Sequence, residues 1–178
     1  RLEFPAADRV GLVGKSARSW DRAVRQLAAT AQSQVAVRRA LANVPTYMIF
    51  DDHDVSDDWN LNQAWCLRVL GKPLGRRVVS NALLAYSLFQ AWGNTPAQFE
   101  PGESGYLLFG LLEELIYTRG YDEYIEAEIS RYLGLPPRQP ESNLPEFRVD
   151  GEDLVLARDP QSLTWNYLID CGGYLVIV

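Results

Sequence analysis

The sequence has few of the residues that build several common kinds of site. Its two cysteines, Cys66 and Cys171, lie far apart in a chain of 178 residues, which argues against a disulfide framework and against the C-x-x-C spacing of zinc sites. It contains a single histidine, His53. The net charge is −6 and no basic stripe is visible, so we expect no nucleic-acid-binding surface.

Long apolar runs are also missing. None approaches the roughly 20 residues that cross a bilayer, so we expect no membrane segment. A signal-peptide pattern is absent too, and the sequence leaves both a cytoplasmic and an exported location open. The apolar fraction of 47% and the charged fraction of 22% are those of a globular region, which we expect to be single over residues 1–178.

Apolar periodicity and helix breakers predict a helix-rich chain. The expected helices cover residues 19–43, 61–70, 76–92, 107–118 and 121–133. Ser19 is the expected N-cap of the first helix. Arg76 and Arg77, at the start of the third, could bind phosphate, but solvated surface charges are the favoured interpretation.

Three segments predict strands or loops. Residues 46–50 are rich in β-formers and are bounded by Pro45 and an acidic cluster, which predicts an internal strand. A proline-rich loop is expected over 135–147, followed by a tight turn at Asp150-Gly151. Residues 163–178 predict terminal strands that form a hairpin. The fold class is therefore α/β, with an internal strand near 46–50 and a C-terminal β-hairpin.

The two ends of the sequence suggest a piece of a longer protein. The chain begins with Arg1, and its last residues, Tyr174–Val178, form an apolar run typical of a buried strand. A natural domain seldom stops inside a core strand. We therefore expect the remainder of a parent chain on both sides.

The segment 51–58, Asp-Asp-His-Asp-Val-Ser-Asp-Asp, has five carboxylates and the single histidine. Neighbouring carboxylates at ~4 Å repel by about 1 kcal/mol even in water, so something must offset this. Helix capping would explain Asp57 and Asp58, which precede a predicted helix, but it leaves the upstream acids unexplained. An EF-hand calcium loop would need glycine and glutamate where Asp57 and Gln63 stand. The third interpretation is a hydrolytic metal site that follows a strand.

Three stretches carry a resemblance to a known family. Residues 44–60, Val-Pro-Thr-Tyr-Met-Ile-Phe-Asp-Asp-His-Asp-Val-Ser-Asp-Asp-Trp-Asn, resemble the central motif of the PhoD-like (alkaline phosphatase D) family of calcineurin-like metallophosphoesterases. Leu-Gly-Arg-Arg at 74–77 and Leu-Phe-Gln-Ala-Trp-Gly-Asn-Thr-Pro at 88–96 resemble the helical stretch that follows it. The resemblance implies that the chain is a partial fragment of the family's α/β sandwich.

The resemblance also implies residue roles. Asp52 takes the place of a metal-binding asparagine and Asp51 that of a glycine, so both are candidate metal ligands. His53 takes the place of the histidine that faces the phosphate, and it would protonate the leaving group or stabilise transition-state charge. Asp54 would orient His53 from outside the ligand set, with Asn60 in a similar supporting position.

The implied function is metal-dependent hydrolysis of a phosphomonoester or phosphodiester. The metal could be calcium, manganese or magnesium on carboxylate ligands, or iron or zinc if other ligands are added. Since the family's other metal-binding motifs have no counterpart here, we expect this chain alone to be inactive and the remainder of the parent chain to complete the site. The alternatives are a non-catalytic interaction or insert module, and a simple acidic cation-binding protein.

Overall fold

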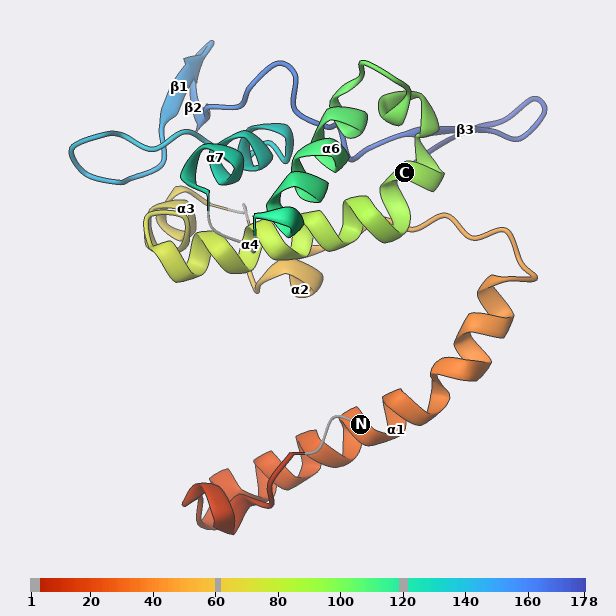
Figure 1. Cartoon of the computed structure of the whole chain (residues 1–178), viewed down its shortest axis with the longest axis vertical. Coiled ribbons are helices and arrows are strands. Elements are labelled where there is room, and N and C mark those ends of the chain that lie inside the picture. Colours follow the sequence, from red (N-terminus) through yellow and green to blue (C-terminus); the bar gives the residue numbers. More distant parts are fainter. Residues whose placement is uncertain (1–3, 60–61, 119–121) are drawn as a thin grey trace. The chain divides into compact units, whose positions relative to one another are not determined.

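The structure, a computed structural model shown in Figure 1, describes residues 4–59, 62–118 and 122–178. It divides into two compact units, Arg1–Thr46 and Tyr47–Val178. The expectation of a single region over 1–178 stays a prediction.

The first unit is built on one long helix, α1 (Gly14–Leu41), preceded by a 3-10 turn, η1 (Ala7–Val10). The indole Nε1 of Trp20 donates to the Pro5 carbonyl at 2.9 Å and ties the lead-in to the helix. The expected N-cap at Ser19 is wrong, because the N-cap is Val13, six residues earlier. It ends before Pro45, as predicted, and contains no buried residue.

Residues 46–50, predicted to be an internal strand, are extended but pair with no strand in the described part of the chain. Exposure alternates along the segment, with Met48 and Phe50 half-buried and Ile49 exposed. The prediction is wrong because period-2 alternation reports only an extended backbone, whereas a strand also needs a partner. Here the Met48 carbonyl accepts hydrogen bonds from side chains instead of from a neighbouring strand.

Three helices follow in the second unit. α2 (Asp52–Val55) and α3 (Gln63–Val69) are short, and both pack against α4 (Pro73–Tyr86). α4 begins at Pro73, three residues before the predicted start, since proline is favoured in the first turn. It continues through a π-helical turn, η2 (Ser87–Ala91), into α5 (Trp92–Asn94), so the predicted stop before Pro96 is confirmed.

The remaining helices complete a core. They are η3 (Pro96–Phe99), α6 (Ser104–Tyr117) and α7 (Glu123–Tyr132), with α6 packed against α7. The predicted break between the helices at 107–118 and 121–133 lies outside the described residues. The buried cluster consists of Val55, Trp65, Cys66, Leu70, Val79, Leu83, Leu108, Ile125, Ile129, Tyr132, Leu133, Leu135 and Leu163. Each fully buried leucine or valine contributes roughly 1.5–3 kcal/mol.

The sheet content is two small antiparallel hairpins. β1 (Phe147–Asp150) pairs with β2 (Asp153–Leu156), and the predicted turn at Asp150-Gly151 is confirmed. β3 (Leu168–Asp170) pairs with β4 (Leu175–Ile177), which confirms the C-terminal hairpin over its second half.

The C-terminal strand is not buried. Leu175 and Ile177 of β4 are 70% and 79% exposed, because in this unit the strand pairs only with β3. The expectation of a core strand at 174–178 concerns a longer parent chain and stays a prediction. The class is a mixed one of helix and sheet, as the coarse α/β prediction requires. Among the described helices, none has the length and apolar character needed to span a membrane.

Candidate metal centre

The acidic segment is held in place by the extended residues before it. Three side-chain donors converge on the Met48 carbonyl oxygen: Tyr86 Oη at 2.9 Å, Asn94 Nδ2 at 2.7 Å and Tyr167 Oη at 3.1 Å. Two residues later, the Phe50 ring lies at the centre of an aromatic cluster. Its centroid is 4.6 Å from that of Tyr86. The chain therefore enters the acidic segment from a fixed position.

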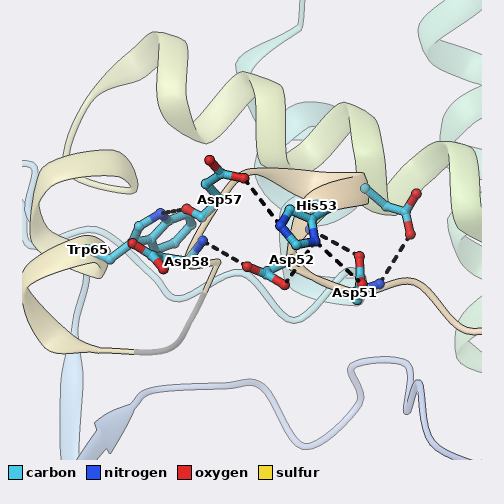
Figure 2. Close-up of polar contacts among 7 residues, drawn as sticks. Asp51, Asp52, His53, Asp57, Asp58 and Trp65 are labelled. Carbon is cyan, nitrogen blue, oxygen red and sulfur yellow. Dashed lines mark hydrogen bonds and ion pairs between the residues drawn. The ribbon is translucent and has the colours of Figure 1, made fainter.

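Two further contacts anchor the segment at its other end. Val55 is buried in the core at 7% exposure. Trp65, from α3, donates its indole Nε1 to the Asp57 carbonyl at 2.9 Å, as Figure 2 shows. Trp59 packs on Phe50 with centroids 5.0 Å apart, so the loop closes back onto its own beginning.

Within the segment, carboxylates cap the short helix α2. The Asp51 side chain accepts the His53 amide at 3.0 Å through Oδ1, and Asp54 Oδ2 accepts the Asp51 amide at 3.2 Å. This is a reciprocal capping box. Capping was expected at Asp57 and Asp58 instead, and that expectation is wrong, because the N-cap of α3 is Asn62.

Asp52 fixes the turn that follows α2. Its Oδ2 accepts the Asp58 amide at 3.0 Å, and Asp58 adopts a left-handed backbone with φ of 62°, a conformation that aspartate tolerates better than most residues.

The EF-hand interpretation fails on the same geometry. Residues two apart on a helical turn point in different directions, so Asp52 and Asp54 cannot line one calcium loop.

Each of the two leading carboxylates uses one oxygen for the backbone and presents the other to the histidine. Asp51 Oδ2 lies 3.7 Å and Asp52 Oδ1 lies 3.8 Å from His53 Nδ1. One potential ligand atom from each of Asp51, Asp52 and His53 lies within 4.8 Å of the other two. The separations exceed a hydrogen bond, and two carboxylate oxygens with an imidazole nitrogen form a donor set that suits a divalent cation.

Solvent lowers the cost of gathering these charges. The side chains of His53 and Asp51 are 75% and 67% exposed, whereas that of Asp52 is 29% exposed. On the far side of the ring, His53 Nε2 lies 3.8 Å from Oδ1 of Asp57, whose side chain is 88% exposed. At such exposure the repulsion between carboxylates stays near the small value it has in water. The hydrogen bonds from three backbone amides then supply the remaining compensation.

The structure brings some of the predicted site residues together. Asp51, Asp52 and His53 form the cluster described above. Asp54, expected to orient His53, is hydrogen-bonded to the Asp51 backbone instead. Asn60 lies outside the described residues.

Sequence reasoning missed the residues that support the loop from a distance. Asn94 is found in the helix-stop segment Gly93-Asn-Thr-Pro, where a polar side chain at a helix end has freedom to bond elsewhere, so a signal existed. Tyr86 lies inside the predicted helix 76–92, and the helical pattern gives no sign of this hydrogen bond. Tyr167 is 119 residues from Met48, and no local pattern indicates that pairing.

The chain matches no family model, no curated protein and no solved structure. Its own residues therefore carry the functional argument. Their arrangement can hold a cation on two carboxylate oxygens and present an exposed imidazole beside it.

Proposed function

We propose that this chain is part of a metal-dependent phosphohydrolase, in which Asp51 and Asp52 bind the metal and His53 acts on the phosphate ester. The main support for this proposal is that the two oxygens of each carboxylate make different contacts. One oxygen is bonded to a backbone amide, and the other is directed to a shared point beside the imidazole. The motif resemblance over residues 44–60 supports the same assignment.

The roles follow from the exposure and position of each group. Asp52, the least exposed of the three, is held by its bond to the Asp58 amide and is the most rigid ligand. His53 presents Nδ1 to the Asp51 and Asp52 carboxylates, and its Nε2, on the exposed side that it shares with Asp57, can give a proton to a leaving oxygen. When bound, the metal polarises the phosphoryl oxygens and lowers the pKa of a bound water.

The number of ligand atoms limits what the chain does alone. Three candidate ligand atoms gather in the described residues, whereas oxygen-coordinated cations take roughly six or more ligands. We therefore expect the 178-residue chain to bind manganese or calcium but to hydrolyse little. Hydrolysis of phosphomonoesters or phosphodiesters is expected from a longer protein in which further residues complete the coordination.

Metal binding is tested first, by isothermal titration calorimetry of the chain with manganese and with calcium. In the variant Asp51→Asn/Asp52→Asn, each amide oxygen still accepts its backbone N–H, because asparagine caps helices as well as aspartate does. The two negative charges are removed. We expect the affinity to fall by roughly tenfold or more, the equivalent of about 1.4 kcal/mol.

Two controls isolate the cluster. Asp150→Asn removes an exposed carboxylate from the β1 hairpin, and Asp57→Asn removes one from the same loop on the Nε2 side of the ring. Both variants should bind the metal nearly as tightly as the unsubstituted 178-residue chain does. Equal losses in all variants would mean that the cation responds only to net charge.

Catalysis is tested in the longer protein with chromogenic phosphomonoester and phosphodiester substrates. His53→Ala should abolish most of the hydrolysis, even at metal concentrations that saturate the site left by the Asp51 and Asp52 carboxylates. Activity that does not depend on His53 would reduce the segment to a simple acidic cation site. A protein inert with every metal would favour the non-catalytic interaction module.

A further inference from the structure

A groove of about 980 Å³ lies in the second unit between α4, α7 and two later loops. It shares no lining residue with the acidic segment. Five arginines line it: Arg76, Arg77, Arg131, Arg138 and Arg158. In a chain of net charge −6, this gathering of cations needs a physical explanation.

Two of the arginines are neutralised within the groove. Arg77 Nη2 contacts Glu126 Oε1 at 2.6 Å. Arg131 is bonded to Glu128 at 2.6 Å and lies 3.6 Å from Asp159. These pairs involve three of the four carboxylates that line the groove, and the fourth is Glu123.

The other three have no carboxylate within ion-pair distance among the described residues. Arg138 and Arg158 are exposed, whereas Arg76 is only 8% exposed. The expectation that Arg76 is a solvated surface charge is therefore wrong. Its Nη1 donates to the Pro136 carbonyl at 2.7 Å, a neutral acceptor that leaves the positive charge unbalanced.

Burial of the Arg76 charge beside a like charge is unfavourable. Burial, together with the nearby charge of Arg138, lowers the pKa of Arg76 to about 10. Buried charges are normally paired. An anion seated against Arg76 would offset the free-energy cost of its desolvation and of its repulsion by Arg138.

The lining changes character along α4. The two arginines at 76 and 77 are followed one turn later by Ser80 and Asn81, and then by Leu84. At 1.5 Å per residue, Leu84 lies about 12 Å along the helix from Arg76. Leu84 and Leu115, also in the lining, pack against the hydrophobic core. The face that α4 contributes to the groove is thus cationic near Arg76 and apolar near Leu84.

We propose that this groove binds a small organic phosphate, with its phosphate group at Arg76, Arg138 and Arg158 and its apolar part toward Leu84 and Leu115. Guanidinium groups bind tetrahedral phosphate oxygens through several charge-assisted bonds. A doubly charged phosphate balances more of the three unpaired cations than a carboxylate does. The volume is within the range of small-molecule sites.

The test is calorimetric titration of the 178-residue chain with phenyl phosphate in the presence of EDTA, which removes any metal contribution. Inorganic phosphate, benzoate and benzyl alcohol are the comparison ligands. Phenyl phosphate should bind saturably, more tightly than inorganic phosphate and at least roughly tenfold more tightly than benzoate. Benzyl alcohol should show no saturable binding.

Rim variants provide the residue-level test without risk to the core. The exposed pair Arg138→Gln/Arg158→Gln should weaken phenyl phosphate binding by at least roughly tenfold. Arg148→Gln, which removes an exposed arginine of β1 outside the groove, should leave it unchanged. Asp51→Asn/Asp52→Asn should also leave phenyl phosphate binding unchanged, so the test of this groove is independent of the test of the metal centre.

Three results would overturn the proposal. One is the absence of saturable phosphate binding at millimolar concentrations. Another is an equal loss in Arg148→Gln, which would show a response to overall charge. The third is benzoate binding as tightly as phenyl phosphate, which would show an apolar or generic anion site.

Discussion

Three donors meet at the Met48 carbonyl, and the carbonyl has only two lone pairs. Tyr86 Oη, Asn94 Nδ2 and Tyr167 Oη all lie within 3.1 Å of this oxygen. One of the three is therefore redundant for satisfying the acceptor. Removal of a single donor leaves two in place, whereas removal of two leaves the carbonyl with one.

The magnitudes follow from the ordinary value of a neutral hydrogen bond. Such a bond contributes about 0.5–1.5 kcal/mol net, and both tyrosines are only 7% exposed. We expect Tyr167→Phe to lower the free energy of unfolding by about 0.5 kcal/mol. Tyr86→Phe should cost slightly more, about 0.5–1 kcal/mol, because the Tyr86 oxygen also accepts from Asn94 at 3.1 Å. The double variant should lose about 2 kcal/mol, which exceeds the sum of the two single losses.

The assay is urea denaturation followed by tryptophan fluorescence, arranged as a double-mutant cycle. Tyr174→Phe is the control, since Tyr174 is 80% exposed and its hydroxyl has no such role. It should change stability by less than about 0.5 kcal/mol. Additivity of Tyr86→Phe and Tyr167→Phe within about 0.3 kcal/mol would refute the redundancy argument, and so would a single loss as large as the double.

Alkaline pH provides an independent readout of the same network. Burial raises the pKa of Tyr86 and of Tyr167 above the ordinary value of 10. A raised folded-state pKa means that this contribution to stability is fully present below pH 10 and is lost as the pH rises through the folded-state value. The double variant should therefore show a weaker decline of stability in that range, measured by urea denaturation at a series of pH values.

Two further predictions concern packing and thiol reactivity. Gly105→Ala should destabilise the protein by about 1–3 kcal/mol, since a methyl group there meets the Phe99 ring. Gly110→Ala on the same helix has open space and should stabilise the protein by about 0.5–1 kcal/mol. Thermal unfolding compares the two variants, and a gain in stability from both would contradict the collision with Phe99. Cys171, which is exposed, should react rapidly with a thiol reagent, whereas Cys66 should react only on unfolding, because it is buried and burial raises its pKa; equal rates at the two sites in the folded protein would contradict this.

Local patterns in the sequence determined most of the helices and both hairpin turns. The stop at Gly93-Asn-Thr-Pro, the turn at Asp150-Gly151 and the break before Pro45 depend on backbone preferences that act within a few residues. The metal-centre candidates Asp51, Asp52 and His53 are consecutive, so their proximity was also available from the sequence.

Tertiary structure decided the features that depend on distant partners. Residues 46–50 have the pattern of a strand, but their hydrogen bonds go to side chains from as far as residue 167. Capping by Asp51 and Asp54 needs a helix of four residues, too short to leave a periodic signal. Arg76 is buried because Pro136 and the segments around it close over the start of α4. In each case the chain pattern set the local conformation, whereas burial and pairing followed from contacts between segments far apart in sequence.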